Sequence, residues 1–206
     1  MCWPAKKVWV FDVSAPEPQI FRDAVVDTLR DGEVAARFKQ AATDALLEPW
    51  TTALTEVVVR SCETLGLSAS GKGHKLDLLP VARSEYLGLD VTAFSEGRGR
   101  WRFATLVAEL ENSRREDLIA YSLWKVLSVR AGMRVVFCYR EESASIPSLL
   151  RHLQQEVVQA MGIVNRSALD GETLVVCGTR DAVNTFPYGY FAWWGLNKNT
   201  GSFERM

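Results

Sequence analysis

The sequence predicts an α/β protein in which a mixed β-sheet is flanked by helices. Residues 20–66 repeat apolar side chains at three- and four-residue spacing, as amphipathic helices do. Strand-like and helical segments then alternate, and the runs 133–141 and 173–179 are almost continuously apolar, which is typical of strands covered on both faces. With 206 residues, 48% hydrophobic and 24% charged, the chain is expected to form a single domain over residues 1–206.

The elements of the first half follow from local patterns. Residues 6–13 predict a short strand, and residues 20–66 predict helices that Pro49 separates or kinks. The small and polar residues 67–75 predict a flexible loop. Residues 76–112 predict an antiparallel hairpin, because two β-branched and aromatic segments flank the turn sequence SEGRGR.

The second half predicts a helix, a strand, a helix and a strand within residues 115–179. The first helix is EDLIAYSLWKVLSVRAG, with Gly132 as its stop signal, and the strand MRVVFCYRE follows. Residues 146–161 predict the next helix, and TLVVCGT, residues 173–179, the next strand. Residues 188–206 predict a terminal hairpin that turns at 197–201.

Composition excludes several classes of function. No apolar run approaches the ~20 residues of a membrane span, and the N-terminus lacks a signal-peptide pattern, so a cytoplasmic protein is expected. Four cysteines without a CxxC pair argue against structural zinc or a disulfide framework. With two histidines and a net charge of −1, chemistry must rest on carboxylates and lysines, and bulk charge does not indicate a nucleic-acid partner.

Three acidic residues of the hairpin form the candidate site. Asp90 lies on the first strand, and Glu109 and Glu111 lie on one face of the second. A tight turn at Gly97–Arg98 would put Asp90 opposite Thr105 and roughly 13 Å from Glu109, at ~3.3 Å per residue, unless the strands bulge or splay. Converged carboxylates are the ligands expected for Mg²⁺ beside a phosphate.

These residues resemble the core of the PD-(D/E)XK nuclease superfamily. The aspartate in EYLGLDVTAF, the acid pair in LVAELEN, the helix after it and the strand MRVVFCY follow the order of that core over residues 50–140. The resemblance implies a restriction-endonuclease-like fold that hydrolyses phosphodiester bonds in nucleic acid, preferably DNA, with Mg²⁺ or Mn²⁺. Glu111 takes the place of the usual lysine, as in members with a Glu-x-Glu motif, and Lys125 corresponds to a lysine moved onto the next helix.

The resemblance also implies a role for each residue. Asp90 and Glu109 would bind the metal ion, Glu111 would orient or activate the water, and Lys125 would stabilise the phosphate. Glu85 and Glu56 are possible additional acids. A homodimer would suit double-strand cleavage. The arginines expected to contact nucleic-acid phosphates are Arg98, Arg100, Arg102, Arg114 and Arg115.

Structural roles remain open for the same residues. The two glutamates could form the exposed face of an edge strand, Lys125 could extend from an amphipathic helix, and Asn112 and Ser113 could cap that helix. RGRWR, residues 98–102, could be a solvated hairpin tip. Trp193 and Trp194 could stack on bases or divide between core and surface. At the level of function, the alternatives are an inactive nuclease-like binding or assembly module and a hydrolase of small phosphorylated molecules.

Overall fold

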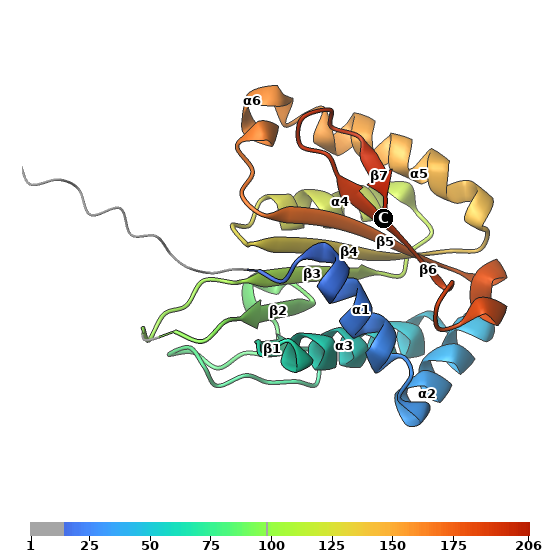
Figure 1. The fold of residues 1–206 in the computed structure, drawn as a ribbon, viewed down its shortest axis with the longest axis horizontal. Coiled ribbons are helices and arrows are strands. Elements are labelled where there is room, and N and C mark those ends of the chain that lie inside the picture. Colours follow the sequence, from blue (N-terminus) through green and yellow to red (C-terminus); the bar gives the residue numbers. More distant parts are fainter. Residues whose placement is uncertain (1–14, 98) are drawn as a thin grey trace, which may run out of the picture.

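One mixed sheet of seven strands, in the order β1-β2-β3-β4-β5-β6-β7, organises the fold (Figure 1). The computed structural model describes residues 15–97 and 99–206. Strands β3, β4 and β5 pair in parallel, and all other neighbouring strands pair antiparallel. The strands are β1 (Ser68–Gly71), β2 (Val91–Phe94), β3 (Leu106–Glu111), β4 (Met133–Arg140), β5 (Glu172–Thr179), β6 (Phe191–Leu196) and β7 (Phe203–Arg205).

Helices cover both faces of this sheet. The N-terminal helices α1, α2 and α3 lie on one face, and α4 and α5 lie on the other (Figure 1). The α-helices are α1 (Pro18–Thr28), α2 (Gly32–Thr43), α3 (Leu47–Thr64), α4 (Glu116–Leu127), α5 (Ile146–Leu153) and α6 (Gly162–Ser167). A π-helical turn, Gln154–Val158, continues α5. The prediction of an α/β protein with a mixed sheet and flanking helices is confirmed.

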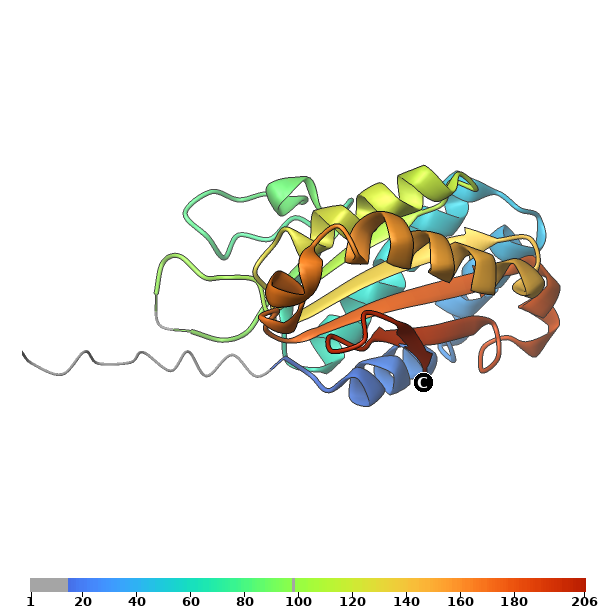
Figure 2. The same ribbon diagram turned by 90° about the horizontal axis from the view of Figure 1, so that it is seen from above.

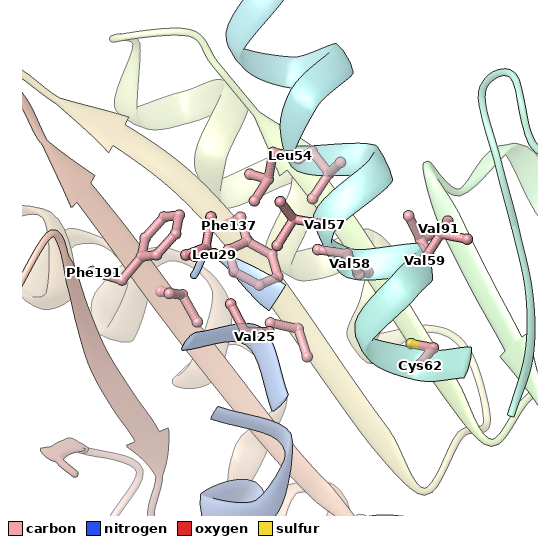
Figure 3. Close-up of a cluster of buried hydrophobic side chains, with 14 of the residues drawn as sticks. Val25, Leu29, Leu54, Val57, Val58, Val59, Cys62, Val91, Phe137 and Phe191 are labelled. Atoms are coloured by element: carbon pink, nitrogen blue, oxygen red, sulfur yellow. The ribbon is translucent and has the colours of Figure 1, made fainter. Parts of the chain in front are cut away.

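The sheet separates two hydrophobic cores. In the first, Val25 of α1 and Val57 of α3 pack against Phe137 of β4, as Figure 3 shows. In the second, Leu123 of α4 and Leu149 of α5 pack against the opposite face. All eight residues of β4 are buried, which explains the continuous apolar run in its sequence. Successive side chains of β3 therefore point alternately toward the first core and toward the second core.

Local sequence explains where α4 lies. Its buried residues recur at three- and four-residue spacing on one side of the helix. Glu116 and Asp117 lie in its first turn and Lys125 in its last, so charged side chains oppose the helix dipole at both ends. The helix ends at Leu127, before the predicted stop at Gly132, and a loop leads into β4.

Several predicted elements need correction. Pro49 neither separates nor kinks helices: it lies in the first turn of α3, where a missing N–H costs nothing, and the chain breaks at 29–31 and 44–46 instead. Residues 67–75 are not only a loop, because Ser68–Gly71 form β1 and pair with β2. The hairpin arms are shorter than predicted, since residues 95–97 and 99–105, between β2 and β3, belong to no strand.

The remaining predictions divide into those confirmed and those outside the described residues. The terminal hairpin is confirmed by β6 and β7. Trp193 is a core residue, whereas Trp194 is half-buried on the opposite face beneath Arg205. The strand predicted at 6–13 lies outside the described residues. Within residues 15–97 and 99–206, no helix is both long and apolar enough to cross a membrane.

A buried hydrogen bond tests how the N-terminal helices attach to the sheet. Trp50 of α3 donates its indole N–H to the hydroxyl of Tyr190, 2.9 Å away and just before β6. We expect Tyr190→Phe to lower the free energy of unfolding by about 1–3 kcal/mol, because the buried N–H loses its acceptor. Urea denaturation measures this change. Tyr188→Phe, at an exposed tyrosine, should change stability by less than about 0.5 kcal/mol, and equal effects would contradict the expectation.

Candidate functional site

The pairing of β2 with β3 brings the candidate acids together. Val91 pairs with Ala108, and Thr92 pairs with Val107, so extending the register by one residue puts Asp90 opposite Glu109. The prediction that Asp90 faces Thr105, roughly 13 Å from Glu109, is therefore wrong. It assumed a tight turn at Gly97–Arg98, whereas the loop 95–105 shifts the pairing. The strands need neither bulge nor splay for these two acids to meet.

Asp90 is held by the backbone of the strand that carries Glu109. Its Oδ2 accepts a hydrogen bond of 2.7 Å from the backbone N–H of Leu110. This bond fixes one carboxylate oxygen at the edge of β2, immediately before the strand begins. Asp90 is half-buried.

Glu109 is a buried carboxylic acid on the face that α4 covers. Its side chain is only 6% exposed. Burial raises the pKa of Glu109 from 4.5 to about 7, the Lys125 ammonium opposes that rise, and the negative charge of Asp90 adds to it. A carboxyl group with this pKa exchanges its proton near neutral pH, in a position where a cation would favour the ionised form.

The side chain of Lys125, on α4, extends to Glu109 on β3. Its Nζ lies 2.8 Å from Glu109 Oε1, and a quarter of its side chain remains exposed. The alternative that Lys125 only extends into solvent is therefore wrong. Asp90, Glu109 and Lys125 form one cluster, which we call the acid–lysine site, and it joins β2, β3 and α4.

Glu111 has different partners from Glu109. One of its carboxylate oxygens accepts a bond of 2.8 Å from the backbone N–H of Ser113, and Ser122 donates to the other at 3.5 Å. These bonds tie the end of β3 to the loop before α4 and to the middle of α4. Asn112 does not cap α4, because its side-chain amide donates to the carbonyl oxygen of Leu47 and to Thr51 on α3.

The two additional acids lie in different parts of the fold. Glu56 is on α3, on the opposite side of the sheet, and pairs with Arg37 and Arg60, so its prediction as an extra acid of this site is wrong. Helical periodicity could not reveal which face of the sheet α3 covers. Glu85 is exposed in the loop between β1 and β2, five residues before Asp90.

The arginines expected to contact phosphates lie at two ends of the β2–β3 hairpin. Arg100 and Arg102 are in the loop 95–105, at the far end from the acids, and Arg102 donates to the carbonyl oxygen of Ser95. Arg114 and Arg115 follow β3 at the near end, paired with Glu141 and Asp117 respectively. Arg98 lies outside the described residues. The contacts of these arginines with nucleic acid stay predictions.

The acid–lysine site offers two carboxylates rather than three to a metal ion. Among residues 15–97 and 99–206, no group of three or more His, Cys, Asp or Glu side chains is arranged to hold a metal. Mg²⁺ is commonly bound by one or two carboxylates, with water and substrate phosphate completing its shell. Asp90 and Glu109 fit that requirement, because like charges opposite each other are stabilised by a shared cation.

Comparison of the chain with known protein families, with curated proteins and with solved structures gives no significant match.

The raised pKa of Glu109 predicts how stability depends on pH in the absence of metal. Ionising this group is harder in the folded than in the unfolded protein, so its contribution is fully present below pH 4.5 and is lost as pH rises through about 7. We expect Glu109→Gln to remove this decline, which follows about 1.4 kcal/mol for each pH unit between the two pKa values. Urea titrations between these pH values measure the decline.

Lys125→Met provides the complementary test. It keeps the packing volume of the side chain but removes the ammonium that lowers the pKa of Glu109. The Glu109 titration, followed by carboxyl NMR, should therefore move to higher pH. An unchanged or lower pKa in this variant would contradict the proposed electrostatic coupling.

Proposed function

We propose that the chain is a metal-dependent nuclease with a restriction-endonuclease-like fold, which hydrolyses phosphodiester bonds in nucleic acid, preferably DNA. The observation that carries this proposal is the meeting of Asp90, Glu109 and Lys125 across two strands and a helix. The order of β2, β3, α4 and β4, with β3 and β4 parallel, agrees with the order of elements in the PD-(D/E)XK core.

Each residue of the acid–lysine site has a defined task in this proposal. Asp90 and Glu109 supply the carboxylate oxygens for Mg²⁺ or Mn²⁺, and the Leu110 N–H holds Asp90 in place. A bound divalent cation stabilises charge on a phosphate and lowers the pKa of its water. Lys125 balances the charge of Glu109 in the metal-free protein, and its partly exposed ammonium is positioned to pair with a phosphate oxygen.

Glu111 occupies the position of the usual lysine, and its role as the residue that orients or activates water stays a prediction. Both of its carboxylate oxygens contact donors of the protein, the Ser113 N–H and the Ser122 hydroxyl. Each carboxylate oxygen keeps a second lone pair, to which a water molecule can still donate. Lys125 is the stronger substitute for the missing lysine, since its ammonium lies 2.8 Å from a Glu109 oxygen.

The second candidate function is an inactive nuclease-like module that binds or assembles with a partner. It is favoured by the net charge of −1 and by the replacement of the usual lysine with Glu111. Plasmid cleavage with Mg²⁺ or Mn²⁺ separates the two candidates. No cleavage with either ion, together with an unchanged melting temperature after metal addition, would favour the inactive module and contradict the nuclease.

The nuclease proposal predicts the effect of charge-removing variants on plasmid cleavage. Asp90→Asn and Lys125→Met should each lower the cleavage rate by roughly 10²- to 10³-fold, because each removes a charge beside the scissile phosphate. Asn retains a side-chain oxygen for the Leu110 N–H, so this variant should fold normally. Asp90→Ala is a poorer test, because it leaves that N–H without its acceptor.

Glu56→Gln is the matched control. It removes a carboxylate from the opposite side of the sheet, and we expect cleavage at the wild-type rate. A rate loss as large as that of Asp90→Asn would show that loss of any carboxylate impairs the protein, and would remove the support for the acid–lysine site.

A further inference from the structure

An exposed aromatic pair lies on α4 beside the acid–lysine site. The rings of Tyr121 and Trp124 stack at a centroid distance of 5.8 Å and an interplanar angle of 22°. Both side chains are 55% exposed, although large apolar surfaces are normally covered. Their stacking leaves the pair with outward-facing ring surfaces held in one orientation, on a regular helix rather than on a loop.

Helix geometry places this pair next to Lys125. Tyr121 and Lys125 are four residues apart and therefore neighbours on one side of α4, and Trp124 is three residues from Tyr121. Lys125 points to Glu109, while the buried residues of α4 face the second core. The aromatic pair thus lies on the exposed side of α4, next to the position from which Lys125 extends to Glu109.

The loop 72–89, between β1 and β2, flanks the other side of the site. Leu89, at the end of this loop, packs in the same core as the buried face of α4, and Figure 2 shows the loop and α4 along the same edge of the molecule. Tyr86 anchors the loop, because its ring packs edge-on against Phe94 of β2 and its single hydroxyl proton lies within reach of two backbone carbonyl oxygens of the loop, each 3.0 Å from the hydroxyl. Asp90 follows this loop directly.

The loop presents basic side chains that form no described ion pair. Lys72, Lys75 and Arg83 are exposed, and among residues 15–97 and 99–206 none of them lies within ion-pair distance of a carboxylate. The loop carries two acids, Asp77 and Glu85, so these cations are in slight excess. The loop that leads into Asp90 therefore carries these cations, and the helix that carries Lys125 also carries the aromatic rings.

We propose that the acid–lysine site acts on single-stranded nucleic acid, whose bases stack on Tyr121 and Trp124 and whose phosphates contact Lys72, Lys75 and Arg83. This inference rests on the proposed nuclease function and adds its substrate class. Single-strand binding surfaces combine aromatic platforms with cations along the backbone. A duplex keeps its bases stacked inside, so it would leave the two exposed rings without a partner.

Fluorescence anisotropy in EDTA tests binding without cleavage. The probes are a short fluorescein-labelled oligothymidylate and the blunt duplex that it forms with oligodeoxyadenylate. We expect the full-length protein to bind the single strand roughly tenfold more tightly than the duplex, and Tyr121→Ala and Trp124→Ala each to weaken that binding by roughly 5- to 100-fold. Tyr121→Phe should retain most of the affinity, because it keeps the ring.

Tyr188→Ala is the matched control, since Tyr188 is 63% exposed but contacts Arg30 near α1 rather than the acid–lysine site. It should bind as the wild type does. Three results would overturn the inference. They are single-strand binding by the Tyr121→Ala Trp124→Ala double variant as tight as by the wild type, tighter wild-type binding of the duplex than of the single strand, and no wild-type binding of either probe. So would a dimer in analytical ultracentrifugation that this double variant dissociates, because the rings would then be a self-association surface.

Asp90→Asn separates this inference from the nuclease proposal. In EDTA the variant should bind the single strand at least as tightly as the wild type, because it removes a negative charge beside the phosphate, and with Mn²⁺ it should cleave the strand roughly 10²- to 10³-fold more slowly. Ring-dependent binding by a wild-type protein that cleaves nothing would support the binding surface and contradict the nuclease. Cleavage at the wild-type rate by a double variant with undiminished affinity would support the nuclease and contradict the aromatic surface.

Discussion

The register between β2 and β3 determines that the two carboxylates of the acid–lysine site lie opposite each other. Because Val91 pairs with Ala108, the next residue outward on each strand is an acid, and Asp90 faces Glu109. A shift of one residue would turn Glu109 into the first core, among the apolar side chains of α1 and α3. The hydrophobic alternation of β3 therefore fixes both the pairing of the sheet and the convergence of the two carboxylates.

This arrangement is electrostatically unfavourable without a cation. Burial and the neighbouring Asp90 charge both raise the pKa of Glu109, and Lys125 compensates only in part. A protein under selection for stability alone would gain from an apolar residue here, since buried ion pairs often contribute little to folding. Retaining a buried acid beside a second acid and a lysine is the kind of pattern that marks functional sites. The same cluster connects β2, β3 and α4, so its geometry depends on elements that the core holds rigidly.

Sequence patterns predict the elements with strong periodicity, but they do not predict how those elements are arranged relative to one another. Continuous apolar runs predict β4 and β5, and the amphipathic pattern that precedes Gly132 predicts α4. Residues 68–71 were missed as a strand because small residues carry no β pattern, although pairing with β2 overrides their weak propensity. The hairpin register depended on a loop length that turn residues alone do not specify. Glu56 is a possible acid of the site on sequence grounds alone, because a helix pattern does not reveal which side of a sheet the helix covers.

The central claim is that Asp90 and Glu109 together bind a divalent cation. Anomalous diffraction from crystals soaked in Mn²⁺ at a pH above 7, where Glu109 is ionised, tests this claim most directly. We expect one anomalous peak between the two carboxylates, with Lys125 displaced from Glu109. A map with no peak there, in crystals whose Asp90 and Glu109 are well ordered and still face each other, would contradict it.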